Sequence, residues 1–270
     1  MVESMNMEYK NLKITREGFV TIVTFNRPEK LNTLSLSLMN EIKAVSESFN
    51  GDSETRVVIF TGAGKNFSCG FDLNDAGRAD QKDDTLLMKY RNMKLGPQMI
   101  RCITEIDQIT IAAVNGLALG GGACITTACD FRIGADNCKI GYPEVNLAMN
   151  LSWVSLPLCV HLIGPARAKR MVILAKKETA ITLLDWGFLD ELAPMDALLD
   201  QAREMAKEYA AQPPLAAQMV KRSVNALVTI HDQAIMHMDS DQLLYATSGE
   251  DFSEAIHALL EKREGNYKGN

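Results

Sequence analysis

The first half of the chain alternates short apolar runs with segments of helical periodicity. The β-branched and apolar runs that predict strands are residues 9–16 and 19–26, paired as a hairpin, and then 57–60, 110–114 and 131–135. The predicted helices are 35–49, capped by Ser35, then 86–103 and the glycine-opened segment 121–129. Because helices separate the strands after the hairpin, we expect a largely parallel sheet covered by helices, which is an α/β fold.

The pattern changes after about Val154, where helical periodicity dominates and only a short strand is predicted at 189–192. We therefore expect residues 1–195 to form the core with the functional site, and residues 196–270 to form a helical C-terminal region. Apolar faces in this region, such as the one with Leu243 and Leu244, are available to cap the core or to pack on another subunit. The polar, aperiodic stretch 74–84 is expected to be a surface loop.

Composition and charge exclude several kinds of partner. The 270 residues are 47% hydrophobic, with a net charge of −6 and no run of Lys and Arg, which argues against nucleic acid and against an anionic membrane surface. Two long uncharged runs, 108–129 and 145–166, are interrupted by three consecutive glycines and by Pro157 respectively, so neither is expected to span a membrane.

Cysteine and histidine spacing gives no indication of a metal or a disulfide. The six cysteines form no CxxC pair and the four histidines no HExxH pattern, which predicts reduced thiols and no metal site. Glu3 and Glu8 lie where a signal peptide needs a basic start and an apolar core, and the final Lys-Gly-Asn is no peroxisomal address. We expect a cytoplasmic protein.

Glycine-rich segments suggest phosphate or dinucleotide binding, but their spacing is wrong for either. The segment 62–66 lacks the first glycine of a phosphate loop and the Ser or Thr after its lysine, and no GxGxxG or GxSxG occurs. Two segments remain, 67–73 and 115–122, each following a predicted strand near a helix start. Bare N–H groups at such positions suit an oxyanion bound between the two loops, although glycines at a helix start also serve packing alone.

Several motifs together resemble one family. They are Asn-Arg-Pro-Glu-Lys-Leu-Asn at 26–32, Phe-Ser-Cys-Gly-Phe-Asp-Leu at 67–73, Ala-Ala-Val-Asn-Gly at 112–116 with the glycines to 122, Cys-Asp-Phe-Arg at 129–132, Gly-Tyr-Pro-Glu at 141–144, Ile-Gly-Pro-Ala-Arg-Ala at 163–168 and Leu-Leu-Glu-Lys-Arg at 259–263. In order and spacing they are similar to the crotonase superfamily, the enoyl-CoA hydratase/isomerase family. The resemblance implies a crotonase-like spiral of ββα units, a helical C-terminal trimerisation region, a homotrimer or hexamer, and an acyl-CoA thioester substrate. It implies no cofactor other than the coenzyme A of the substrate.

The resemblance also assigns catalytic positions. The two oxyanion-hole N–H groups fall on Phe71 and Gly121, and of the two glutamates in the family's hydratases the second is Glu144 whereas the first falls on Cys124. A thiol with an unperturbed pKa near 8.5 is a poor substitute for a carboxylate, so hydration lacks one of its two proton-transfer groups. One carboxylate is enough to move a proton from C2 to C4 of a 3-enoyl-CoA, which favours a Δ3,Δ2-enoyl-CoA isomerase with Glu144 as the proton shuttle.

The alternatives are a hydratase, hydrolase or lyase whose missing group comes from elsewhere, such as Tyr142, or a non-catalytic CoA-ester-binding relative. The resemblance further implies substrate-binding positions, which lie at the CoA rim, in the acyl pocket and on the last helix. These residues are Lys30, Leu31, Asp72, Leu73, Cys124, Trp153 and Lys262.

Overall fold

The computed structural model describes residues 8–75 and 84–270, and within these residues the main sheet has six strands. In spatial order they are β1 (Leu12–Glu17), β2 (Val20–Phe25), β3 (Val57–Gly62), β4 (Ile109–Val114), β6 (Phe131–Ala135) and β9 (Glu191–Ala193). β1 and β2 form the predicted antiparallel hairpin, and every later pairing is parallel. All six residues of β4 are buried, as expected for a parallel strand covered on both faces. The predicted α/β fold is confirmed.

A second, smaller sheet lies beside the first and was not predicted. It consists of β5 (Leu117–Leu119), β7 (Lys139–Gly141) and β8 (Glu178–Thr179), with β7 in the middle. These strands have two or three residues each, too few to show an alternating pattern of apolar and polar residues. The small sheet matters for function because both glycine-rich segments are attached to it.

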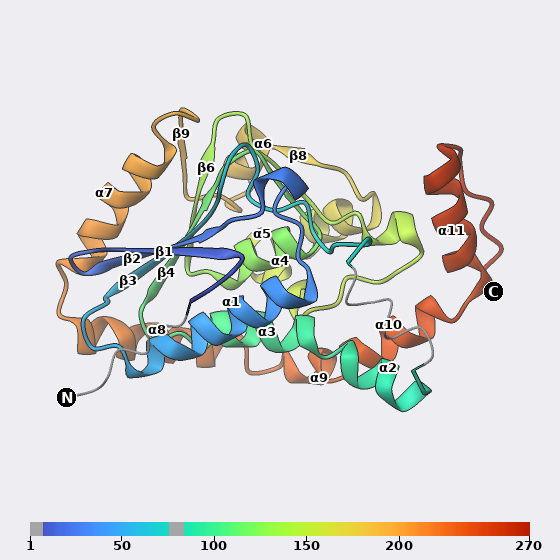
Figure 1. Cartoon of the computed structure of the whole chain (residues 1–270), viewed down its shortest axis with the longest axis horizontal. Helices are drawn as coiled ribbons and strands as arrows, with labels where there is room; N and C mark the ends of the chain where they lie inside the picture. The colour runs from blue at the N-terminus through green and yellow to red at the C-terminus, as the bar shows by residue number, and fades with distance from the viewer. Residues whose placement is uncertain (1–7, 76–83) are drawn as a thin grey trace.

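Helices cover the sheets and continue into the C-terminal region (Figure 1). They are α1 (Leu36–Ser48), α2 (Leu86–Asn92), α3 (Leu95–Thr104), α4 (Gly121–Ala128), α5 (Ser155–Ile173), α6 (Ala180–Asp185), α7 (Leu198–Ala210), α8 (Pro214–Val228), α9 (Gln233–Met236), α10 (Asp239–Thr247) and α11 (Glu250–Glu261), with 3-10 turns η1 (Pro28–Lys30), η2 (Phe49–Gly51) and η4 (Glu144–Leu147). α7 packs across β2, β3 and β4, whereas α1 packs on α3. Figure 1 shows α11 at the end of the molecule opposite the β1–β2 hairpin.

Local sequence explains the start of α1 and one wrong prediction. The Ser35 hydroxyl accepts from the Leu38 N–H and begins α1, as predicted. The single helix expected over 86–103 is instead two helices, because Pro97 in the first turn of α3 has no N–H and its ring excludes a continuous helix through Met93. Most of the predicted loop at 74–84 lies outside the described residues.

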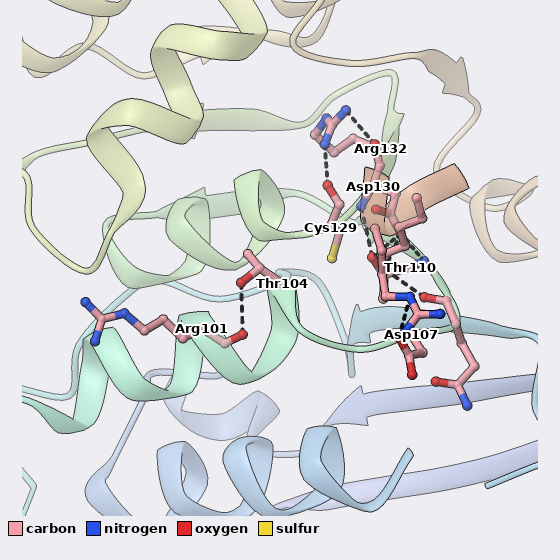
Figure 2. Close-up of polar contacts among 10 residues, drawn as sticks. Arg101, Thr104, Asp107, Thr110, Cys129, Asp130 and Arg132 are labelled. Atoms are coloured by element: carbon pink, nitrogen blue, oxygen red, sulfur yellow. Dashed lines mark hydrogen bonds and ion pairs between the residues drawn. The ribbon is translucent and has the colours of Figure 1, made fainter. Parts of the chain in front are cut away.

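The C-terminal helices are joined to the core by buried polar contacts. Lys221 on α8 lies 2.6 Å from Asp130 and donates to the Gln108 carbonyl at 2.8 Å. Asp130 also accepts from the N–H and hydroxyl of Thr110, and Arg132 donates to the Cys129 and Asp130 carbonyls (Figure 2). The division of the chain at residue 195 stays a prediction. Among the described residues, no helix is both long enough and apolar enough to cross a membrane.

Candidate active site

The two glycine-rich segments lie side by side. Residues 67–71 run along β5, where the Ser68 N–H donates to the Leu117 carbonyl at 3.1 Å and the Leu119 N–H donates to the Ser68 carbonyl at 2.9 Å. Gly70 has a φ of +86°, and a Cβ at this position would lie 2.8 Å from the Leu119 carbonyl oxygen. Only glycine permits this conformation and this close approach, so Gly70 fixes the distance between the two loops.

The backbone N–H groups of Phe71 and Gly121 belong to the two segments that come together at Gly70. The Leu34 N–H donates to the Gly70 carbonyl at 2.8 Å and the Asp72 N–H donates to the Leu34 carbonyl at 3.0 Å, so alternation along an extended chain directs the Phe71 N–H away from Leu34. Gly121 is the first residue of α4, and its N–H has no partner within the helix. Its nitrogen would lie 3.6 Å from a Cβ on Gly70. The helix dipole favours an anion at this point.

Glu144 begins η4, and its carboxyl group lies close to Gly120. The Gly120 N–H donates to the Gly141 carbonyl at 3.0 Å, which ties the glycine loop to the strand that precedes Glu144. Gly120 has a φ of +52°, and a Cβ there would lie 3.0 Å from Glu144 Oε1. The Glu144 Oε2 atom is buried and has no hydrogen-bond partner among the described residues. Burial raises the pKa of this carboxyl from 4.5 to about 7.

Cys124 lies on α4, one turn after Gly121, and is buried. The pKa of the Cys124 thiol is well above its usual value. Burial is the largest cause, and the nearby Glu144 carboxylate is the next. The thiol therefore stays protonated at neutral pH and is neither a nucleophile nor a general base. The structure thus places Cys124 beside Glu144, where the resemblance expects the other carboxylate.

Tyr142 lies in the same buried environment. Its side chain is completely buried and its Oη has no hydrogen-bond partner among the described residues. Burial, followed by the neighbouring Cys159 and Cys124, raises the pKa of Tyr142 well above its usual value. Tyr142 can therefore contribute a neutral hydroxyl but no phenolate.

The Trp153 indole borders the Phe71 and Gly121 N–H groups, which are called the oxyanion region below. A Cβ on Gly121 would lie 2.5 Å from Cζ3 of the indole, and a Cβ on Gly96 would lie 2.4 Å from its Nε1. The Phe71 ring meets the indole edge-on, with the ring centroids 6.2 Å apart and an interplanar angle of 89°. The structure therefore brings Trp153, predicted in the acyl pocket, next to both Phe71 and Gly121.

The residues predicted at the CoA rim divide into two groups. Lys30, Leu31 and Leu73 are exposed, and the Leu31 carbonyl accepts from the Cys69 N–H at 3.1 Å, so this turn borders the first glycine-rich segment. Asp72 instead points inward and pairs with Arg27 at 2.9 Å, both side chains being nearly buried. Burial alone would raise the pKa of Asp72, but the hydrogen bond from Arg27 makes it lower than usual. This carboxylate joins the loop to Arg27, and a substrate-binding role for Asp72 stays a prediction.

Lys262 follows a helix that packs against η4, the turn that begins at Glu144. It ends α11 in a left-handed conformation and is exposed. Figure 1 shows α11 standing apart from α1 and α4.

Three residues that the sequence did not single out also build the site. Leu34 lies against Gly121, and Gly96 gives the indole room. The third is Asp239 at the start of α10, a buried carboxylate that accepts a hydrogen bond from the Val154 N–H. Asp239 lies in a polar segment 85 residues after Val154, so no local sequence pattern indicates that it is buried at the site.

Comparisons with known proteins identify the family of the chain. The sequence model of the family described as enoyl-CoA hydratase/isomerase matches residues 15–270. A short-chain-enoyl-CoA hydratase from Clostridium acetobutylicum is 31% identical over 96% of this chain and 97% of that protein. The crystal structure of an enoyl-CoA hydratase from Bacillus anthracis is 29% identical with a TM-score of 0.76, and covers 97% of this chain and 100% of that one.

A monofunctional enoyl CoA isomerase from M. smegmatis is similar as well, with 28% identity and a TM-score of 0.69 over 81% of this chain and 93% of that one. The fold and the site define a crotonase-like protein. The chain belongs to the enoyl-CoA hydratase/isomerase family, and it is an enzyme of that family.

Proposed function

We propose that this enzyme is a Δ3,Δ2-enoyl-CoA isomerase that acts on an acyl-CoA thioester. The observation that carries the proposal is the pairing of one ionisable carboxyl, Glu144, with a protonated thiol at Cys124, beside two backbone N–H groups. Syn-addition of water needs two proton-transfer groups at the reacting carbons, whereas allylic isomerisation needs only one. A pKa of about 7 suits Glu144 to both halves of that reaction, since it must accept a proton and then return it.

The reaction follows from the positions of these groups. The Glu144 carboxylate removes a proton from C2 of the 3-enoyl-CoA, and the electron pair of that C–H bond delocalises onto the thioester oxygen and the C3–C4 double bond. The Phe71 and Gly121 N–H groups bind the oxygen of the resulting dienolate. The protonated Glu144 then gives its proton to C4, and the C2–C3 double bond forms with no net change in charge or atoms.

The oxyanion region supplies the main stabilisation. A backbone donor aimed at a developing oxyanion contributes about 3–4 kcal/mol in comparable sites. The Trp153 and Phe71 rings pack edge to face beside these N–H groups, and apolar rings in such a place strengthen hydrogen bonds to an oxyanion by limiting contact with water. Because the donors are main-chain groups, a phenylalanine at position 71 keeps the hydrogen bond.

A hydratase is the second candidate, favoured by the names of relatives such as the Clostridium acetobutylicum enzyme. In that case Tyr142, buried next to Cys124, would have to supply the proton that the missing glutamate supplies elsewhere. The same experiment distinguishes the two candidates.

The proposed assembly is a homotrimer or a hexamer. Helix α8 and the residues after it expose large apolar side chains in the single chain. These are Leu215, Met219, Val220, Val224, Leu227 and Ile230. An exposed apolar face of this extent is typical of a subunit interface.

The test is product analysis by mass spectrometry after incubation with 3-enoyl-CoA or 2-enoyl-CoA in D2O. We expect double-bond migration and deuterium incorporation without 3-hydroxyacyl-CoA, and we expect Glu144→Gln to abolish both. Rapid formation of 3-hydroxyacyl-CoA from 2-enoyl-CoA would refute the isomerase and support the hydratase. Binding without exchange or product would refute both the isomerase and the hydratase.

A further inference from the structure

A carboxylate from the C-terminal region reaches the wall of the oxyanion site. Asp239, the first residue of α10, is only 4% exposed, and its Oδ2 accepts a hydrogen bond from the Val154 N–H. Burial raises the pKa of Asp239 above its usual value, opposed by the Val154 N–H and by Arg101. Figure 2 shows the Arg101 side chain extending away from Thr110 and Asp130. A carboxylate in such a place needs stabilising contacts, and among the described residues these are the hydrogen bond from the Val154 N–H and the positive charge of Arg101.

The backbone that Asp239 holds is in an uncommon conformation. Trp153 and Val154 are consecutive non-glycine residues with φ values of 58° and 57°. A β-branched residue such as valine is a clear outlier in the left-handed region, and it persists only when its surroundings fix it. The hydrogen bond from the Val154 N–H to Asp239 is such a constraint, because that N–H belongs to the peptide between Trp153 and Val154.

The consequence reaches the oxyanion region directly. The Trp153 indole packs on Gly121 so closely that a Cβ there would lie 2.5 Å away, and its edge meets the Phe71 ring. If the turn at residues 153–154 relaxed to negative φ, the indole would leave this position. Water would then reach the two N–H groups.

We propose that Asp239 is a positioning residue that holds the turn at residues 153–154 and thereby keeps the Trp153 indole against the oxyanion region. This deepens the proposed function, on which it rests, by naming the group through which α10 supports the site. Glu144 moves the proton, and Asp239 acts only through Trp153. A neutral side chain with an acceptor oxygen at position 239 therefore serves almost as well as the carboxylate.

The test compares Asp239→Ala with Asp239→Asn in a Trp186→Phe background, so that Trp153 is the only tryptophan. For Asp239→Ala we expect a red-shifted Trp153 emission and a kcat lower by about 10²-fold, as for a misplaced active-site group. KM should change much less, because the CoA rim is untouched. For Asp239→Asn we expect unchanged emission and a kcat within about fivefold of the parent, because a neutral acceptor loses only part of a charge-assisted bond.

Two controls lie on the same helix. Asp241→Asn removes an exposed charge, and Gln242→Ala removes the Oε1 acceptor of a 3.1 Å hydrogen bond that the Asn150 amide donates. Both should leave the emission unchanged. Unchanged emission and kcat in Asp239→Ala would overturn the proposal. So would an Asp239→Asn variant with normal emission and a 10²-fold loss of kcat, because that result would make Asp239 a proton-transfer group.

A third readout separates this proposal from the isomerase assignment. Acetoacetyl-CoA forms an enolate without help from Glu144, and its ultraviolet band reports binding to the oxyanion region. If the parent protein lacks isomerase activity but Asp239→Ala weakens this binding and shifts the emission, Asp239 keeps its role and the proposed reaction is wrong. If binding and emission are both unaffected by Asp239→Ala, the positioning role is wrong whatever the reaction.

Discussion

Replacing the buried carboxyl at the centre of the site should inactivate the enzyme and stabilise it at the same time. The pKa of Glu144 is about 7 in the folded protein, against 4.5 for an unburied glutamate. The folded state therefore binds its proton more tightly than the unfolded state. Between these two pH values the unfolded chain releases the proton first, so the free energy of unfolding falls as the pH rises.

The size of this effect follows from the two pKa values. Each pKa unit corresponds to 1.36 kcal/mol, so the carboxylate costs about 3 kcal/mol at pH 8 and less than about 1 kcal/mol at pH 5. Glu144→Gln removes the charge but keeps the shape and the buried polar atom. We expect the variant to be more stable than the parent by about 3 kcal/mol at pH 8 and nearly equal to it at pH 5.

Urea unfolding at pH 5, 6, 7 and 8 measures the difference, with protein concentration held constant because subunit assembly shifts the apparent stability. Glu29→Gln, at an exposed position, is the matched control and should show no such pH dependence. A difference between Glu144→Gln and parent that stays the same from pH 5 to pH 8 would show that the carboxyl titrates normally, and the reasoning from burial would be wrong.

Three further predictions concern the same groups. The kcat/KM for isomerisation should fall tenfold per pH unit below about pH 7, where Glu144 becomes protonated, and level off above it; a pH profile of 2-enoyl-CoA formation measures this. Gly120→Ala should cost about 1–3 kcal/mol of stability and most of the activity, because φ is +52° and the new Cβ lies 3.0 Å from Glu144 Oε1; urea unfolding and kinetics check both. Cys124→Ser should keep kcat within about tenfold, since the thiol transfers no proton; a large loss would give Cys124 a catalytic role.

The sequence predicted the elements that carry long apolar runs and clear caps. The β1–β2 hairpin, β3, β4 and β6 and the Ser35-capped helix were all predicted correctly. The break at Pro97 was missed because apolar periodicity continues through it, although the proline is visible in the sequence. The small sheet was missed because two or three residues carry no periodic signal.

The site was predictable where it is built from local sequence. Both glycine-rich segments were identified by their glycines, and the structure places them next to each other and next to Glu144. The inward turn of Asp72 and the contact of Asp239 with Val154 were not predictable, because each depends on a partner distant in the chain: Arg27 lies 45 residues from Asp72, and Val154 lies 85 residues from Asp239.

The most direct test of a single proton shuttle is the fate of the transferred hydrogen itself. A 3-enoyl-CoA carrying two deuteriums at C2, converted in ordinary water, passes one of them to Glu144, whose Oε2 is buried. We predict 2-enoyl-CoA in which part of the product carries deuterium at C4 as well as at C2. Complete loss of the transferred label to water, together with accumulation of 3-hydroxyacyl-CoA, would contradict the one-carboxylate mechanism.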